Sequence, residues 1–276
     1  MNYNDLFRLI QRKRSFLCIG LDTDIKLIPS HLLGAEDPVF EFNKQIVDAT
    51  LAFTVAYKPN LAFYEARGEA GWRSLRKTLE YIRNKDKDVF LIADAKRGDI
   101  GNTSGLYAEA FFEHLKVDAV TLSPYMGLDT VAPFLKYKDH WVVLLALTSN
   151  QSASDFQLTK DESGLSLFEK VLKVSKTWAS PDQLMFVVGA TRADELKRVR
   201  ALVPENFLLV PGVGAQGGSL QEVARYGMNS HCGLLINSSR GIIYASAGVD
   251  FAERAAEKAI ELQAEMESLL KANHLI

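Results

Sequence analysis

One short segment of the sequence alternates acidic and basic side chains directly after an apolar stretch. It reads Asp94-Ala95-Lys96-Arg97-Gly98-Asp99 and follows the apolar residues 89–93. In an extended strand, the side chains of Asp94 and Lys96 point to the same face, because successive side chains alternate. Charges this close couple their titrations, so the protonation of one group depends on the others. The segment is therefore a candidate catalytic centre, and a structural network of salt bridges is the alternative for the same residues.

Charged residues also follow two earlier apolar stretches. Asp22 follows residues 16–21, and Lys58 follows residues 53–57 within the sequence Tyr-Lys-Pro-Asn. If these stretches are parallel strands of one barrel, their carboxyl ends meet at one rim, where the functional groups of such barrels collect. We therefore expect Asp22 and Lys58 to lie in one site with the run 94–99.

Two loops near the end of the sequence predict a phosphate site. Residues 211–218 read Pro-Gly-Val-Gly-Ala-Gln-Gly-Gly, and residues 237–241 read Asn-Ser-Ser-Arg-Gly. Glycines let backbone N–H groups approach an anion closely, and Arg240 can hold a phosphate through two hydrogen bonds. The loops after the last two strands of a barrel frequently form such a site. Residues 213–218 are also a candidate for a mobile gate over the substrate.

Eight short apolar stretches must position these residues. They alternate with segments of helical periodicity, such as residues 72–83, 103–114, 165–178 and 193–201. This alternation predicts a parallel sheet, and eight units in 276 residues favour a closed barrel over an open sheet. We expect residues 1–276 to form one α/β domain, a (β/α)8 TIM barrel. The predicted strands are Phe16–Leu21, Phe53–Tyr57, Val89–Ala93, Ala119–Leu122, Trp141–Leu147, Leu184–Val188, Phe207–Val210 and Gly233–Ile236.

Two segments, residues 23–52 and residues 149–166, stand outside the simple repeat of strand and helix. A helix is expected at residues 41–52, before the second strand, and an amphipathic helix at residues 251–272 completes the outer ring. Residues 149–166, after the fifth strand, are polar and unusually long for such a connection. They are either a lid or insertion, or a passive surface loop.

The composition narrows the class of partner and the cellular compartment. The net charge is −2, which argues against a nucleic-acid partner because phosphate binding needs a basic surface. No apolar stretch approaches the roughly 20 residues that a transmembrane helix needs. The two cysteines, Cys18 and Cys232, lie in or beside apolar runs, so buried free thiols and a cytoplasmic location are expected.

Taken together, the motifs resemble those of the orotidine 5'-monophosphate decarboxylase family. They are Asp-x-Lys-x-x-Asp at residues 94–99, Tyr-Lys-Pro-Asn at residues 57–60, and the glycine-rich run at residues 211–218. They occur in the right strand order, and the likeness extends from Asp22 to Arg240. The sequence Ala-Lys-Arg-Gly-Asp and the chain length are similar to those of the longer bacterial form.

The resemblance implies a reaction and a set of catalytic residues. The reaction would be the cofactor-free and metal-free decarboxylation of orotidine 5'-monophosphate to uridine 5'-monophosphate, the last step of de novo pyrimidine biosynthesis. Asp94 would lie beside the substrate carboxylate, Lys58 would belong to the same charged network, and Lys96 would donate the proton to the carbon that loses carbon dioxide. Asp99 and Thr103 would reach across a homodimer interface into the partner's site.

The resemblance also implies how the small-molecule nucleotide is held. Asp22, with Lys58, would bind the ribose hydroxyls. Ser149, in the loop after the fifth strand, would contact the pyrimidine. Gln216, Gly217 and Arg240 would bind the phosphate.

Two other functions fit part of the pattern. Magnesium-dependent sugar-phosphate synthases and decarboxylases of the same barrel group share the Asp-x-Lys-x-x-Asp run. They have an acidic residue where this chain has Lys58, and an ammonium there opposes a divalent metal. A catalytically inactive nucleotide-binding barrel is the second alternative, although a binding protein has no use for a positioned proton donor.

Overall fold

The computed structural model describes residues 1–190, 193–213 and 218–276 and shows a closed barrel of eight parallel strands. The strands follow one another around the ring in sequence order, and β8 closes it on β1 through the pair Leu17 and Ile236. The strands are β1 Leu17–Gly20, β2 Ala56–Lys58, β3 Phe90–Arg97, β4 Ala119–Leu122, β5 Trp141–Leu147, β6 Leu184–Val188, β7 Leu208–Pro211 and β8 Leu234–Ser238.

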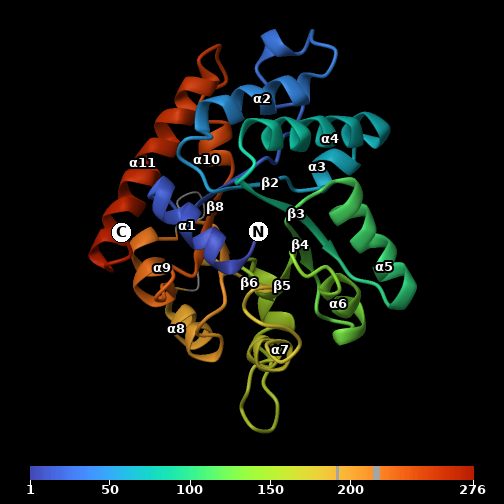
Figure 1. The fold of residues 1–276 in the computed structure, drawn as a ribbon, viewed down its shortest axis with the longest axis vertical. Helices are drawn as coiled ribbons and strands as arrows, with labels where there is room; N and C mark the ends of the chain where they lie inside the picture. The colour runs from blue at the N-terminus through green and yellow to red at the C-terminus, as the bar shows by residue number, and fades with distance from the viewer. Residues whose placement is uncertain (191–192, 214–217) are drawn as a thin grey trace.

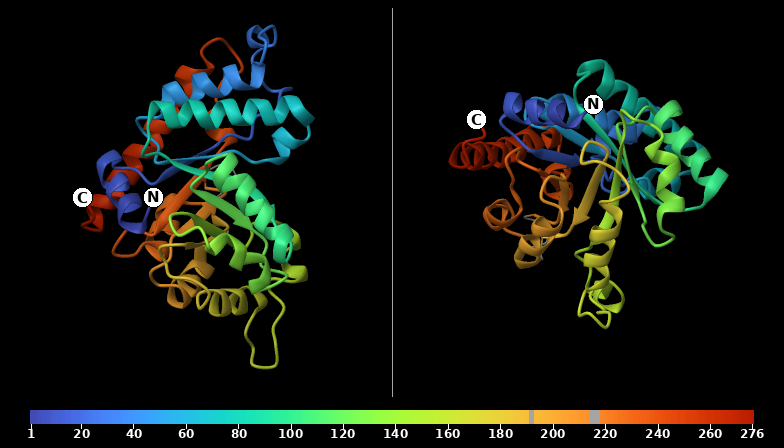
Figure 2. Two further views of the ribbon diagram at one scale, coloured as in Figure 1. Left: turned by 45° about the vertical axis from the view of Figure 1, so that its right-hand side comes forward. Right: turned by 60° about the horizontal axis from the view of Figure 1, so that its bottom comes forward.

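Helices surround the barrel on the outside (Figures 1 and 2). Amphipathic helices around such a barrel turn their apolar faces inward and leave their charged faces to solvent. The α-helices are α1 Tyr3–Lys13, α2 Pro38–Thr50, α3 Ala62–Glu65, α4 Gly68–Lys85, α5 Gly101–Glu109, α6 Leu128–Leu135, α7 Leu167–Ser175, α8 Ala193–Leu202, α9 Leu220–Gly227, α10 Arg240–Ile243 and α11 Phe251–Ala272. Shorter helical turns are η1 Ser30–Leu32, η2 Ala110–His114 and η3 Gln151–Asp155.

The predicted (β/α)8 barrel is therefore confirmed. All eight apolar stretches form strands within a few residues of the expected bounds, and the helix at 251–272 begins and ends where the periodicity predicts. The largest difference is at β3, which continues to Arg97 and so carries the first four residues of the charged run. Both cysteines are buried free thiols, as expected. Within the described residues, no helix has both the length and the apolarity to cross a membrane.

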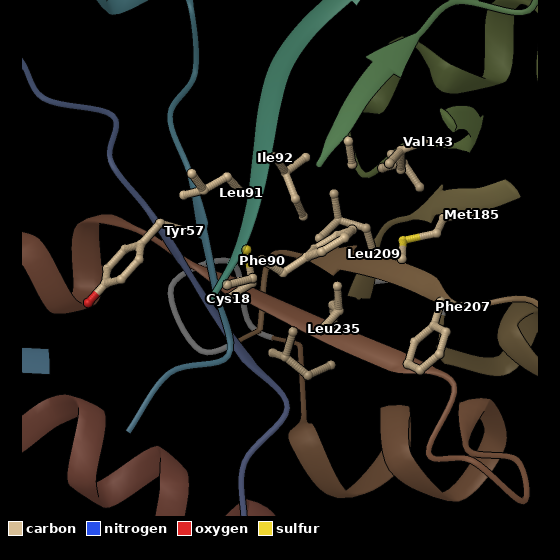
Figure 3. Close-up of a cluster of buried hydrophobic side chains, with 14 of the residues drawn as sticks. Cys18, Tyr57, Phe90, Leu91, Ile92, Val143, Met185, Phe207, Leu209 and Leu235 are labelled. Carbon is tan, nitrogen blue, oxygen red and sulfur yellow. The ribbon is translucent and has the colours of Figure 1, made fainter. Parts of the chain in front are cut away.

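The interior of the barrel is an apolar core built from alternate strand residues. Figure 3 shows Phe90 and Ile92 of β3 with Leu209 of β7 and Leu235 of β8, and all four are buried. Tyr57 of β2 points away from them, and its hydroxyl lies 2.8 Å from that of Thr50 on α2. Because strand side chains alternate, Asp94, two residues after the inward-facing Ile92, and Lys58, one residue after the outward-facing Tyr57, lie at the end of the barrel interior.

Helix α1 covers the amino-terminal end of the barrel (Figure 1). Tyr3 packs edge-on against Phe207, with ring centroids 5.0 Å apart, and its hydroxyl donates to the Glu205 carbonyl. The indole N–H of Trp141, the first residue of β5, donates to the Met1 carbonyl at 2.7 Å. This end is therefore closed by packing, so the opposite, carboxyl end is the one available for a ligand.

The connection between β5 and α7 projects from the barrel as a long loop (Figures 1 and 2). It contains η3 and an antiparallel bridge between Lys160 and Ser166, and Phe156 within it is 71% exposed. Ser166 begins α7 with a capping box, in which its side chain and that of Glu169 satisfy each other's backbone N–H groups. The Lys160–Ser166 bridge thus closes the segment next to the start of α7.

Arg200 on α8 connects several backbone segments on the amino-terminal side of the barrel through hydrogen bonds. Its guanidinium donates to five backbone carbonyls, at distances of 2.7–3.1 Å. Burial lowers the pKa of Arg200 to about 10, so the side chain stays charged at neutral pH. The carbonyls belong to the end of α9, the loop before β7 and the residue before β8: Gly227, Val203, Pro204, Asn206 and Gly233.

We expect Arg200→Met to lower the free energy of unfolding by about 3 kcal/mol, because the carbonyls lose a charged donor while the aliphatic length is kept. Urea denaturation followed by circular dichroism measures this change. Arg254→Met is the matched control, since Arg254 is exposed and pairs with Asp250, the residue before α11, and with Glu257 of α11. Equal destabilisation by the two substitutions would contradict the role of Arg200.

Candidate active site

A cavity of about 280 Å³ lies at the carboxyl ends of the strands. It is continuous with the barrel interior, because Leu145, Val187 and Leu209 form its floor among the inward-facing strand residues. Six of the residues predicted from the sequence line it: Asp22, Lys58, Asp94, Lys96, Ser149 and Arg240. Two more of them, Gln216 and Gly217, lie outside the described residues.

The centre of the cavity is a chain of two ion pairs that share Asp94. The Lys58 ammonium donates to Oδ2 of Asp94 at 3.0 Å, and the Lys96 ammonium donates to Oδ1 at 2.5 Å. The side chains of Lys58 and Asp94 are only 6% and 10% exposed, whereas that of Lys96 is 49% exposed. One cation is thus buried beneath the carboxylate, and the other faces the open part of the cavity.

The ion pairs keep the buried groups charged. Burial by itself would raise the pKa of Asp94, but the Lys58 and Lys96 ammonium groups outweigh it and lower that pKa to about 2. Burial would likewise lower the pKa of Lys58, but the carboxylates of Asp94 and Asp22 raise it above its usual value. Asp94 is therefore an anion and Lys58 a cation throughout the physiological pH range.

The last residues of β3 are displaced from the regular ladder with β4. Ala93 pairs with Val120, and Arg97 pairs with Leu122, so β3 contains two more residues than β4 between these pairs. Lys96 lies in this bulge with a φ of 48°, in the left-handed region. The bulge brings both Asp94 and Lys96 to the cavity.

Asp22 lines the cavity beside the end of β1. Its Oδ2 accepts a hydrogen bond from the Ser239 hydroxyl at 2.7 Å. Its Oδ1 is buried and has no hydrogen-bond partner among the described residues. A Cβ at Gly20 would lie 1.7 Å from Oγ of Ser239, so only glycine at this position leaves room for that contact. A buried carboxylate oxygen without a donor on the protein is an acceptor available to a water molecule or to a bound ligand.

The described residues of the predicted phosphate loops follow β7 and β8, which lie across the closed barrel from β3 and β4. Arg240 is exposed and is the first residue of the short helix α10, directly after β8. Gly212 follows β7 with a φ of 99°, a conformation that glycine readily adopts. Val213 and Gly218 pair in an isolated bridge, which holds together the two ends of the segment proposed as a gate. Residues 214–217 of that segment lie outside the described residues.

Asp99 and Thr103 are not among the residues that line the cavity of their own chain. The Asp99 N–H donates to the Thr130 hydroxyl at 2.8 Å, and Thr103 is exposed in the first turn of α5. A side chain at Gly98 would contact Met126. Large apolar side chains are exposed around these residues: Ile100, Leu106, Tyr125, Met126 and Leu128.

The structure adds cavity residues that the sequence reasoning did not assign. Asn60 and Ser239 lie within quoted motifs, so the motifs contained a signal for them. Thr121, in the middle of an apolar strand, had none. Among the described residues, no three His, Cys, Asp or Glu side chains are grouped as potential metal ligands.

Comparison with known proteins agrees with the geometry. Residues 15–255 match the model of the orotidine 5'-phosphate decarboxylase / HUMPS family. An orotidine 5'-phosphate decarboxylase of Porphyromonas gingivalis is 59% identical over 276 residues, which is the whole of both chains. One from Bacteroides fragilis is 60% identical over 272 residues, or 99% of each chain.

Solved structures with this fold include an OMP decarboxylase and a UMP synthase, both from Leishmania donovani. The first is 35% identical with a TM-score of 0.79, and the match covers 96% of this chain and all of the other. The second is 36% identical with a TM-score of 0.81, and the match covers 95% of this chain and 57% of the other. The family match and the full-length relatives lead to one conclusion: the chain belongs to the orotidine 5'-phosphate decarboxylase / HUMPS family.

Proposed function

We propose that the protein decarboxylates orotidine 5'-phosphate to uridine 5'-phosphate, the last step of de novo pyrimidine biosynthesis, without a metal or other cofactor. The observation that carries the proposal is the half-exposed Lys96 ammonium, bound to the buried carboxylate of Asp94 inside the cavity. Relatives at about 60% identity over the full length carry the name orotidine 5'-phosphate decarboxylase, which supports the same reaction.

The proposed chemistry uses the two ends of the ion-pair chain. The bond between the pyrimidine ring and its carboxylate breaks, carbon dioxide leaves, and the electron pair stays on the ring carbon. The Lys96 ammonium stabilises that developing negative charge and then transfers its proton to the carbon. Asp94 lies beside the departing carboxylate, and the repulsion between them is relieved when carbon dioxide leaves. A proton from water then restores the ammonium.

Lys58 favours this reaction over a magnesium-dependent one at the same barrel rim. Its ammonium binds Oδ2 of Asp94 at 3.0 Å and is almost completely buried. A divalent cation at Asp94 would therefore meet a fixed positive charge about 3 Å from its carboxylate ligand, which is strongly unfavourable at low dielectric. This is the basis for preferring the cofactor-free decarboxylase to the sugar-phosphate enzymes that the family description also covers.

In this proposal, different residues bind the ribose, the pyrimidine and the phosphate of the substrate. Asp22, with Lys58, binds the ribose hydroxyls, and the unpartnered Oδ1 of Asp22 accepts from one of them. Ser149 contacts the pyrimidine edge. Arg240 binds the phosphate together with Gln216 and Gly217, and the start of α10 adds backbone N–H groups. Binding of the distant phosphate can then contribute to closure of the site over the base.

The site is completed by a second copy of the chain in this proposal. Asp99 and Thr103 follow the catalytic strand but do not line their own cavity. The exposed apolar residues of α5 and the loop before α6 surround them, and an apolar surface of this kind favours burial in a homodimer. Asp99 would then lie beside the partner's Lys96, where its negative charge would attract that ammonium and help to orient it.

The central test follows the orotate absorbance of orotidine 5'-phosphate after addition of the purified protein and a chelator. We expect the absorbance to fall with the chelator present. The Lys96→Ala variant should lose at least on the order of 10³-fold in kcat, since the proton donor is removed, while it still binds uridine 5'-phosphate in calorimetry. Turnover only after addition of magnesium would favour the sugar-phosphate enzymes, and binding without turnover would favour an inactive nucleotide-binding barrel.

Arg240→Ala should raise the KM for orotidine 5'-phosphate and lower kcat/KM by roughly 10- to 100-fold, because a charged donor to the phosphate is lost. Steady-state kinetics measure both constants. Arg225→Ala is the matched control, because Arg225 lies on the neighbouring helix α9 and is not among the residues that line the cavity. Unchanged kinetics for the Arg240 variant would remove this residue from the phosphate site.

A shared site predicts that two inactive variants restore each other's activity. When Lys96→Ala and Asp99→Ala chains are co-expressed, each mixed dimer keeps one site with both native residues, so about a quarter of wild-type activity should return. Co-expression of Lys96→Ala with Asp94→Ala is the control, because these residues serve the same site and every site stays defective. No recovery in the first mixture would contradict the exchange of Asp99 between subunits.

A further inference from the structure

Thr121 occupies the one position of β4 that faces the bulge in β3. The regular pairs on either side are Val120 with Ala93 and Leu122 with Arg97, so Thr121 is the single β4 residue opposite residues 94–96. In a regular ladder, the backbone N–H groups of β3 would find partners on the neighbouring strand. A bulge removes such partners, and a buried N–H without one is unfavourable.

The Thr121 hydroxyl supplies the missing partner and binds the catalytic carboxylate with the same oxygen. Its Oγ1 accepts a hydrogen bond from the Lys96 N–H at 2.9 Å. The same hydroxyl donates to Oδ1 of Asp94 at 3.0 Å. Oδ1 is also the atom that accepts from the Lys96 ammonium, at 2.5 Å. One hydroxyl therefore connects the backbone of one proposed catalytic residue to the side chain of the other.

The surroundings of Thr121 leave this hydroxyl little freedom. The side chain is 1% exposed, and its strand neighbours Val120 and Leu122 are fully buried. A threonine hydroxyl has one hydrogen to donate, and here Asp94 takes it, so the Lys96 N–H must approach a lone pair of the oxygen. This arrangement fixes the direction of both bonds.

The backbone of Lys96 needs such support, because its φ of 48° is unfavourable for a residue with a side chain. If the support is lost, relaxation of this residue would rotate the direction in which its long side chain leaves the strand. Because Lys96 Nζ must lie within hydrogen-bond distance of both Asp94 and the reacting carbon, a small rotation changes catalysis more than it changes binding.

We propose that Thr121 is a positioning residue for the decarboxylation: its hydroxyl holds Lys96 in the left-handed conformation and orients Asp94 toward the Lys96 ammonium. The inference rests on the proposed function, in which those two residues carry the chemistry. It requires no contact between Thr121 and the reacting atoms, because Thr121 acts through its two neighbours.

The first experiment compares Thr121→Val, which keeps the shape and removes the hydroxyl, with Thr121→Ser, which keeps the hydroxyl. We expect Thr121→Val to lower kcat by roughly 10- to 100-fold with little change in KM. Thr121→Ser should retain kcat within about threefold, since its oxygen can make the same two bonds. A valine variant with wild-type kcat, or a serine variant as impaired as the valine one, would overturn the proposal.

Thr54→Val is the matched control for the general effect of losing a buried hydroxyl. Thr54 is fully buried, and its Oγ1 donates to the backbone carbonyls of Leu17 and Ala56, at the other end of the barrel. Its replacement should lower thermal stability and leave kcat unchanged. If the Thr54 and Thr121 variants lowered kcat equally, the effect would be one of stability, and the positioning role would be wrong.

A crystal structure of the Thr121→Val variant separates this inference from the proposed function. We expect the φ of Lys96 to leave the left-handed region or the Lys96 ammonium to move away from Oδ1 of Asp94. Unchanged geometry at both residues would overturn the positioning role, whatever the activity. If instead the wild-type protein failed to decarboxylate orotidine 5'-phosphate and the valine variant still showed the rearrangement, only the proposed reaction would fail.

Discussion

A single buried carboxylate organises the functional end of this barrel. Asp94 accepts hydrogen bonds from two ammonium groups and from the Thr121 hydroxyl. Its two carboxylate oxygens therefore join these groups at the centre of the cavity. An isolated carboxylate at this depth would be unstable as an anion. The buried Lys58 on one side compensates that cost and leaves the half-exposed Lys96 on the other side available to the cavity. The attraction of the two ammonium groups lowers the pKa of Asp94 to about 2 despite its burial.

The barrel supplies the rigidity that the network requires. Parallel strands carry Lys58 on β2, Asp94 on β3 and Thr121 on β4, so the interacting groups come from three adjacent strands of the barrel. The apolar interior beneath them, shown in Figure 3, excludes water from one side of the charges and strengthens their attraction. The amino-terminal end is closed by α1 and stabilised by Arg200, which is not among the described residues that line the cavity. Stability and chemistry are thus separated along the barrel axis.

The charged residues of the run 94–99 do not all lie in the same place. Asp94 and Lys96 face the cavity, whereas Asp99 follows the bulge and lies outside it, near exposed apolar side chains. One strand end therefore lines the cavity of its own chain, whereas the residue that ends the motif lies outside it. The proposed homodimer would give this division a role, because Asp99 would then complete the site of the second subunit.

Much of this protein could be predicted from its sequence, because local patterns encode it. Alternating apolar stretches and helical periodicity predicted all eight strands, and the charged residues directly after them predicted the rim where Asp22, Lys58, Asp94 and Lys96 meet. What depended on the tertiary structure was the detail of their contacts. The partition of one buried and one exposed lysine around Asp94 follows from the depth of each strand end in the closed barrel. The bulge in β3, the left-handed Lys96 and the Thr121 hydroxyl that supports it arise from the pairing of two strands, and pairing between strands cannot be read from either strand alone.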